Sequence, residues 1–178
     1  VTSIGSGAFS NNPITTLTFE ADSSLSNIGT LAFQNNDISS LVIPNSVQII
    51  GLGAFRDNSI NSLVIPNSVT SIDTGAFYGN NNLNDVIMPY GSEFATRTDL
   101  FSNSPIIQYS LVIDDGVTTI SNESYQDVSL ISVTIPNSVT DICNSAFRKN
   151  KIPSLTIPSS VTTIENAAFL NNDITSLT

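Results

Sequence analysis

The sequence predicts a solenoid, a stack of short coils that is mainly β, with a parallel sheet and short helical turns. Three observations predict this fold class. A unit of 22 to 24 residues recurs along the chain, and such a period is typical of stacked repeats. Each unit carries a short apolar segment with the two-residue period of a strand. A small residue followed by an aromatic residue marks a compact turn in nearly every unit. We therefore expect a single repeat domain over residues 1–178.

Large aromatic residues define the period. Successive aromatic residues are 22 or 24 positions apart, at Phe9, Phe33, Phe55, Phe77, Phe101, Tyr125, Phe147 and Phe169. The eight units that contain them begin near residues 1, 25, 47, 69, 93, 117, 139 and 161. Aliphatic residues stand eight and five positions before each aromatic residue, except in the fifth unit, which has Glu93 and Thr96 there. One coil cannot bury these side chains alone, so equivalent residues should stack in columns.

Asparagine occupies the third position after the aromatic residue in six of the eight units, at Asn12, Asn36, Asn58, Asn80, Asn150 and Asn172. A buried amide can donate and accept hydrogen bonds, and buried backbone groups need such partners. We expect these side chains to form an internal ladder that satisfies backbone groups of their own coil and of a neighbouring coil.

The strand segment of a unit is an apolar triplet with a β-branched middle residue, as in Leu63-Val64-Ile65. Such residues favour strands. In most units a proline follows, which ends the strand, and in three units Asn-Ser then turns the chain. A second extended stretch, such as residues 69–72, leads to the compact turn, where a small residue such as Ala76 lets the chain pass close to the core. Stacked coils of this kind place the strands in a parallel sheet.

Composition excludes several functions. The chain has 15 acidic and 5 basic residues and a formal net charge of −10, so neither nucleic acid nor membrane insertion is expected. No apolar run approaches the roughly 20 residues that span a bilayer. Histidine is absent and Cys143 is the single cysteine, which removes the commonest general base and metal ligand. We expect no enzyme, no metal and no cofactor, and an inert thiol at Cys143.

The pattern LVIPNSVxxIxxxAF recurs almost intact in residues 41–55, 63–77, 133–147 and 155–169. It resembles the BspA-like leucine-rich repeat, and the resemblance covers essentially the whole chain. A cysteine is frequent in that family three places after the phenylalanine, where this chain has asparagine. The resemblance implies a right-handed leucine-rich-repeat superhelix. It also implies a cell-surface or secreted protein that is similar to adhesins, with host matrix or cell-surface proteins as partners.

The outward positions of the predicted strands form two stripes. The first stripe consists of Thr18, Val42, Val64, Ile87, Val112, Thr134, Thr156 and Thr178, and beside it lie Thr16, Ser40, Ser62, Asp85, Ser110, Ser132, Ser154 and Ser176. One interpretation is a solvated sheet with ordinary strand-forming residues. The other is a face that binds a partner, since a half-apolar stripe beside hydroxyl groups offers both burial and hydrogen bonds. Ice binding is a remote alternative. Flat arrays of threonine and serine on a solenoid occur in ice-binding proteins, but here one coil alone has threonine in both stripes, at Thr16 and Thr18.

The fifth unit departs from the pattern over residues 90–110. Three interpretations are open: a decayed repeat, a bend in the solenoid, or a local binding site. The candidate site residues are Tyr90, Phe94, Arg97, Asp99 and Tyr109, because aromatic residues and arginine are favoured at interfaces.

Two functions from different classes follow. The first is a non-catalytic protein-binding or adhesion module that acts through the exposed sheet face. The alternative is a structural stalk or spacer that has no ligand of its own. Because no polar capping segment is evident, we expect the chain to be a fragment of a longer array, or to associate end to end.

Overall fold

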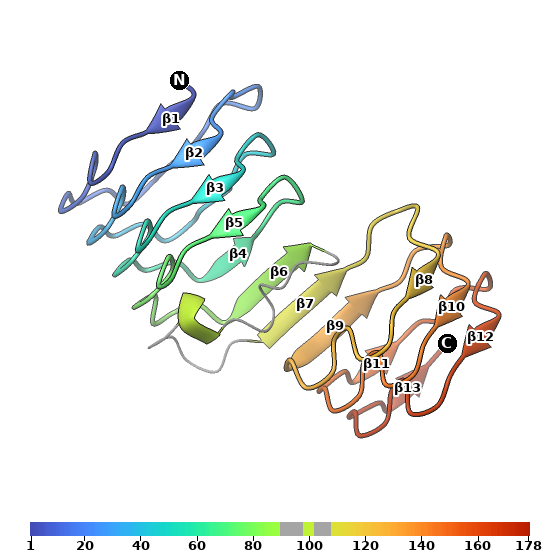
Figure 1. The fold of residues 1–178 in the computed structure, drawn as a ribbon. Coiled ribbons are helices and arrows are strands. Elements are labelled where there is room, and N and C mark those ends of the chain that lie inside the picture. Colours follow the sequence, from blue (N-terminus) through green and yellow to red (C-terminus); the bar gives the residue numbers. More distant parts are fainter. Residues whose placement is uncertain (90–97, 102–107) are drawn as a thin grey trace. The chain divides into compact units, whose positions relative to one another are not determined.

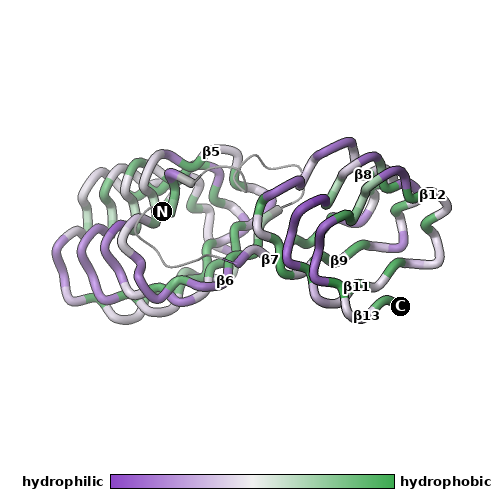
Figure 2. Tube along the Cα trace, turned by 90° about the horizontal axis from the view of Figure 1, so that it is seen from below, coloured by the Kyte–Doolittle hydropathy of each residue, from purple (hydrophilic) through white to green (hydrophobic). Residues whose placement is uncertain are grey.

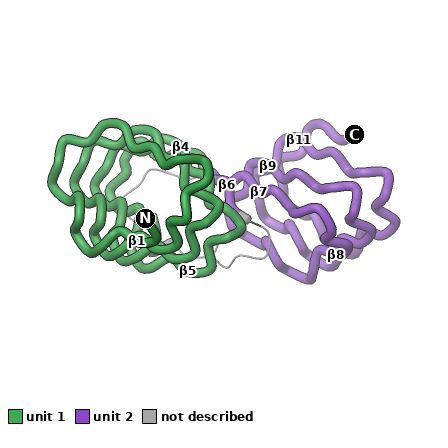
Figure 3. The backbone as a smooth tube through the Cα atoms, turned by 90° about the horizontal axis from the view of Figure 1, so that it is seen from above, with its two compact units in different colours: residues 1–86, 96–107 green, residues 87–95, 108–178 purple. Residues whose placement is uncertain are grey.

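The computed structural model describes residues 1–89, 98–101 and 108–178. The chain divides into two compact units, which Figure 3 distinguishes by colour. Unit 1 comprises residues 1–86 and 96–107, and unit 2 comprises residues 87–95 and 108–178. Each unit is a stack of coils with short parallel strands (Figure 1).

In unit 1 the second extended stretch of each coil forms a four-stranded parallel sheet. Its strands are β1 (Ser3–Ile4), β2 (Asn27–Ile28), β3 (Ile49–Ile50) and β5 (Ser71–Ile72), in that spatial order. Equivalent isoleucines pair, so that Ile28 lies between Ile4 and Ile50 in the register. The apolar triplets contribute β4 (Ser62–Val64), and β6 (Asp85–Pro89) is the equivalent strand one repeat later. The 3-10 helix η2 (Thr98–Leu100) also belongs to this unit.

Unit 2 repeats the arrangement, and its described strands pair in parallel. The second extended stretches form a sheet in the order β12 (Thr163–Ile164), β10 (Asp141–Ile142) and β8 (Thr119–Ile120). The apolar triplets form the pair β7 (Gln108–Val112) and β9 (Leu130–Thr134), and the pair β11 (Ser154–Leu155) and β13 (Ser176–Leu177). The hydropathy pattern recurs from coil to coil, as Figure 2 shows.

The aromatic residues stack inside each unit. The rings of Phe33 and Phe55 are 5.4 Å apart, those of Phe55 and Phe77 are 5.6 Å apart, and both pairs are nearly parallel. In unit 2, Phe147 stacks on Phe169 at 5.1 Å and on Tyr125 at 5.7 Å. The predicted columns of equivalent side chains are therefore confirmed. An aromatic pair contributes about 0.5–1.5 kcal/mol beyond the burial of its area, so the stack stabilises each coil against its neighbours.

The compact turns obtain their shape from alternating backbone conformations. In coils other than the fifth, the residues two positions before and two positions after the aromatic residue have positive φ, as at Gly53 (57°) and Asp57 (53°). Alternate N–H groups then donate to the following coil, so that the N–H of Phe55 donates to the carbonyl of Ala76 at 2.8 Å. Ala76 is fully buried, as expected for a chain that passes close to the core. Among the described residues the helical segment is η2 alone, so most of these turns are tight but not helical.

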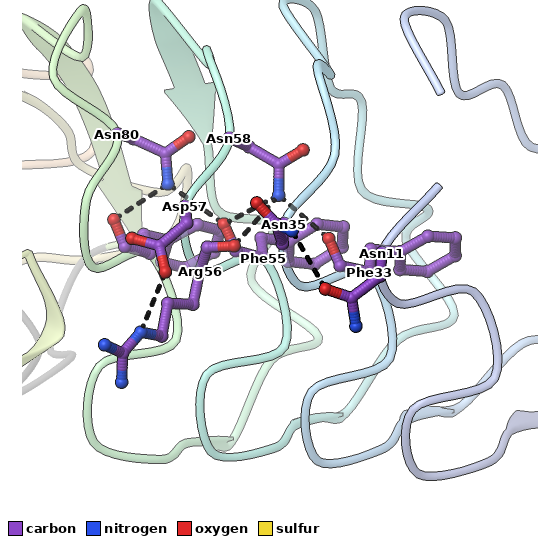
Figure 4. A network of polar contacts seen from close by, with 9 residues as sticks. Asn11, Phe33, Asn35, Phe55, Arg56, Asp57, Asn58 and Asn80 are labelled. Carbon is purple, nitrogen blue, oxygen red and sulfur yellow. Dashed lines mark hydrogen bonds and ion pairs between the residues drawn. The ribbon is translucent and has the colours of Figure 1, made fainter. Parts of the chain in front are cut away.

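The asparagines form the predicted ladder, which Figure 4 shows in part. Asn58 is buried, and its Nδ2 donates to the carbonyl of Phe55 at 3.1 Å and to that of Phe33 in the preceding coil at 2.9 Å. Its Oδ1 accepts the N–H of Ile38 at 3.1 Å. Asn80 makes the same contacts one coil later. Each amide thus satisfies three backbone groups in two coils.

The fold class expected from the sequence is confirmed. The irregular fifth unit still contributes Phe101, whose ring stacks on that of Phe77 at 5.7 Å. Its neighbour Leu100 is fully buried. The aromatic column therefore continues into a unit whose sequence lacks the usual aliphatic residues.

Candidate binding surface

The outward stripe of unit 1 is exposed where the sequence predicts it. Val42 and Val64 are 75% and 52% exposed, whereas Leu63 and Ile65 on either side of Val64 are buried. This alternation arises because successive side chains of a strand point to opposite faces. Thr18 is exposed as well. The unit therefore presents β-branched side chains outward along the edge of each coil.

The stripe of unit 2 is aligned by strand pairing. Val112 of β7 pairs with Thr134 of β9, and Ser110 pairs with Ser132. Val112, Thr134 and Thr156 are exposed, and Ile87 is half-buried. The neighbouring stripe of hydroxyl groups is in register too, since Ser154 pairs with Ser176.

The chemistry of both stripes is nearly neutral. The members are valine, isoleucine, threonine and serine, with Asp85 as the single charged residue among them. Short β-branched side chains lose little conformational entropy when a partner covers them. The hydroxyl groups can donate and accept hydrogen bonds at the rim of such a contact. This face can bind a partner by burying apolar area, without titrating groups or metal ions.

The candidate site in the fifth unit is described in part. Tyr90, Phe94 and Arg97 lie outside the described residues. Tyr109 is half-buried and packs against the core of unit 2, and burial raises the pKa of its hydroxyl above the ordinary value. It stands at a β-bulge, because Tyr109 pairs with Leu130 while Ser110 pairs with Ser132. Its ring therefore supports the core of the unit.

Cys143 is half-buried beside acidic residues. Burial raises the pKa of its thiol above the ordinary value, and the carboxylates of Glu165 and Asp141 raise the pKa further. A thiol whose pKa is raised is a weak nucleophile at neutral pH. In the described part of the chain, no three histidine, cysteine, aspartate or glutamate residues gather as metal ligands do. No helix of this part is long and apolar enough to cross a membrane.

A groove of about 340 Å³ lies on the compact turns of unit 1 and not on the sheet face. Its lining consists of Leu52, Gly53, Arg56, Thr74, Gly75, Tyr78 and Asp99. The guanidinium of Arg56 lies 4.6 Å from the ring centre of Tyr78, and its Nε donates to Asp57 at 3.1 Å (Figure 4). The sequence pattern did not predict this groove. The available signal was that Arg56 and Tyr78 occupy the same repeat position one coil apart.

Stacked coils with parallel strands, an inner aromatic column and an asparagine ladder define a leucine-rich-repeat solenoid. The chain belongs to the BspA type leucine-rich repeat family, whose model matches residues 2–111 and 95–178, with six copies. This confirms the resemblance seen in the sequence. No curated protein matches the chain.

Solved structures of bacterial leucine-rich repeat proteins are similar to this chain. A leucine-rich repeat protein from Eubacterium ventriosum is 25% identical with a TM-score of 0.51, and the match covers 99% of this chain and 52% of that one. A leucine-rich repeat protein from Bacteroides ovatus is 23% identical (TM-score 0.40; 78% and 36% covered). A leucine rich cell surface protein from Faecalibacterium prausnitzii is 17% identical (TM-score 0.37; 86% and 53% covered). The chain thus spans about half the length of the first of these proteins.

Proposed function

We propose that the chain is a non-catalytic binding module of a cell-surface or secreted protein, and that it holds a protein partner on its outward sheet stripes. The observation that carries this proposal is the exposure of apolar side chains at a position where a stable solenoid does not need them. Val42 and Val64 are exposed while the inward residues next to them are buried. An apolar stripe with few charges is the composition expected of the centre of an interface.

Family membership supports the class of function. The repeats are of the BspA type, and one similar structure is described as a leucine rich cell surface protein. The partner we propose is a protein of the host matrix or of a cell surface. A neutral face suits such a partner, because it binds by burial and is insensitive to the acidic charge of the rest of the chain.

The experiment is a binding assay against a panel of purified extracellular matrix proteins, with Val42→Lys/Val64→Lys as the test variant. We expect the affinity to fall at least tenfold, since a lysine in the centre of an interface leaves a charge unpaired. Ile49→Lys is the matched control. Ile49 is also an exposed β-branched residue (44%), but it lies on β3 in the other sheet.

Equal binding by the double variant and the parent chain would contradict the proposal and would favour a stalk or spacer without a ligand. Circular dichroism and thermal unfolding check that both variants are folded. Substitutions at exposed positions usually change the free energy of unfolding by less than about 0.5 kcal/mol.

A further inference from the structure

The few basic residues of this acidic chain are unevenly distributed. Three of its five basic residues lie within four consecutive positions, at Arg148, Lys149 and Lys151. They are also the only basic residues of the sequence 108–178. We call these three residues the basic patch. A local cluster of lysine and arginine is typical of surfaces that bind polyanions, whatever the net charge of the whole protein.

The compact turn of the seventh coil holds the backbone of the basic patch in place. Asn150 is buried as a member of the ladder, and its Nδ2 donates to carbonyls of two coils. The N–H of Lys149 donates to the carbonyl of Leu170, and the N–H of Lys151 donates to that of Leu130, both at 2.8 Å. The two lysine side chains are exposed on either side of the buried amide. Two residues span at most about 7 Å, so both cations extend from neighbouring points of an ordered turn.

The described residues around the basic patch leave its charges unpaired. Among these residues, none of the three basic side chains forms an ion pair, and the Nε of Arg148 is buried without a hydrogen-bond partner. Arg56 occupies the same repeat position in unit 1, but its Nε donates to the carboxylate of Asp57. The basic patch can therefore bind an anion without first breaking an internal ion pair.

Carboxylates limit the extent of the basic patch. Asp127 occupies the repeat position of Lys149 one coil earlier, and Asp173 occupies that of Lys151 one coil later. Charges farther away than about 8 Å are largely screened at physiological ionic strength. A broad anionic surface would meet both carboxylates, whereas a narrow anionic chain can contact the basic patch alone. The geometry therefore favours a linear polyanion with a high density of charge.

The aromatic residues near the basic patch do not suit nucleic acid. Single-stranded nucleic acid is bound by stacking its bases on accessible aromatic side chains. Tyr125 and Phe147 are buried, and Phe169 stacks on Phe147 in the same inner column. A polysaccharide has no bases to stack, and its sulfate groups can accept several hydrogen bonds from lysine and arginine.

We propose that the basic patch binds a sulfated glycosaminoglycan, a linear polysaccharide with sulfate groups along its length. Lys149 and Lys151 contact the sulfate groups as point charges, and the guanidinium of Arg148 adds a third positive charge beside them. The proposed function supplies the setting, an extracellular surface where such glycans occur. The basic patch does not require a protein partner on the sheet stripes, so it adds a second class of ligand.

The test is isothermal titration calorimetry of the whole chain with a heparin decasaccharide. We expect a Kd on the order of 10–100 μM at 50 mM NaCl, and roughly tenfold weaker binding at 200 mM, because about three contacts release counterions. Hyaluronan of equal length, which has carboxylates but no sulfate groups, should bind more weakly. The proposal is overturned if heparin does not bind, if hyaluronan binds equally, or if a single-stranded oligonucleotide of equal charge binds more tightly.

Lys149→Gln/Lys151→Gln removes two charges at exposed positions and should weaken heparin binding at least tenfold. The matched control is Gln48→Glu/Arg56→Gln, which changes the net charge by the same amount at exposed positions of unit 1. The control should retain the heparin affinity of the parent chain, because its substitutions lie outside the basic patch. Equal losses in the two variants would show that net charge controls binding, and would contradict a local site.

Asp127→Asn tests the position of the glycan by a gain of affinity, which misfolding cannot produce. Asp127 is exposed and has a φ of 60°, a conformation that asparagine also adopts readily. Removing this carboxylate should strengthen heparin binding by about twofold to threefold, and unchanged or weaker binding contradicts the proposed site. The double lysine variant should keep any binding of matrix proteins by the sheet stripes, so the two proposals can fail independently.

Discussion

At the scale of single residues, the asparagine ladder shows how a turn with few strand hydrogen bonds remains stable inside the protein. The amide of Asn58 contacts the carbonyls of Phe33 and Phe55 and the N–H of Ile38. These backbone groups are buried with it, and a buried polar group without a partner costs about 1–3 kcal/mol. The side chain thus provides the backbone groups with the hydrogen bonds that a neighbouring strand provides elsewhere in the solenoid.

Asn58→Ala is expected to lower the free energy of unfolding by about 1–3 kcal/mol, because it removes the partner of the buried N–H of Ile38. The carbonyls of Phe33 and Phe55 keep a second asparagine donor, Asn36 and Asn80 respectively. Urea unfolding followed by circular dichroism measures the change. Asn12→Ala is the control, because Asn12 is exposed and its Nδ2 contacts carbonyls of its own coil alone. Equal losses in the two variants would show that the contacts between coils contribute nothing.

Cys143 allows a prediction about pH. Burial, Glu165 and Asp141 raise the pKa of its thiol above its ordinary value, so the folded chain ionises at higher pH than the unfolded chain. Alkylation by iodoacetamide should therefore have a higher pH midpoint in the folded chain than in denaturant. As the pH rises through the range in which the unfolded thiol ionises, the unfolded state loses its proton first, so stability should decline there. A folded midpoint at or below that of the denatured chain would contradict this.

At the scale of elements, the sequence predicted the strands and columns but not the conformation of the compact turns. The strands follow from a two-residue apolar period, and the columns follow from the repeat. The positive φ values fall on residues as different as Gly53, Leu31, Glu123, Ser145 and Ala167. No residue type marks the position, because the hydrogen bonds of the stacked coil impose the conformation.

Gly51 lies at the start of the compact turn, where two neighbouring coils approach each other closely. A Cβ added there would lie 2.7 Å from the nitrogen of Thr30 and 2.9 Å from the carbonyl carbon of Gly29. Backbone atoms cannot move aside at low cost, so Gly51→Ala should lower the free energy of unfolding by about 1–3 kcal/mol.

The control is Gly5→Ala, at the same repeat position in the first coil, where a Cβ would have nothing within 4 Å. Thermal unfolding of the two variants measures the difference. If Gly51→Ala is as stable as Gly5→Ala, the coils can separate at this position without loss.

At the scale of the whole molecule, repetition explains which sites the sequence could reveal. The sheet stripes repeat in every coil, so their positions were predictable from Val42, Val64 and their equivalents. The groove depends on a combination that occurs in one place: glycine at two successive coils, with Arg56 and Tyr78 beside it. Its geometry depends on the positive φ of those glycines (57° and 64°), which the sequence did not predict.

The repeat architecture also predicts how far the effect of a core substitution extends along the stack of coils. Each coil is stabilised by its immediate neighbours, so a lost core side chain should weaken the adjacent coils most. Phe147 is fully buried between Tyr125 and Phe169, and Phe147→Ala should cost about 3–5 kcal/mol. Hydrogen exchange should then accelerate most at β10 and at the neighbouring strands β8 and β12, with less effect in coils farther along unit 2. Uniform acceleration over all described strands of unit 2 would show instead that the unit unfolds as one cooperative block.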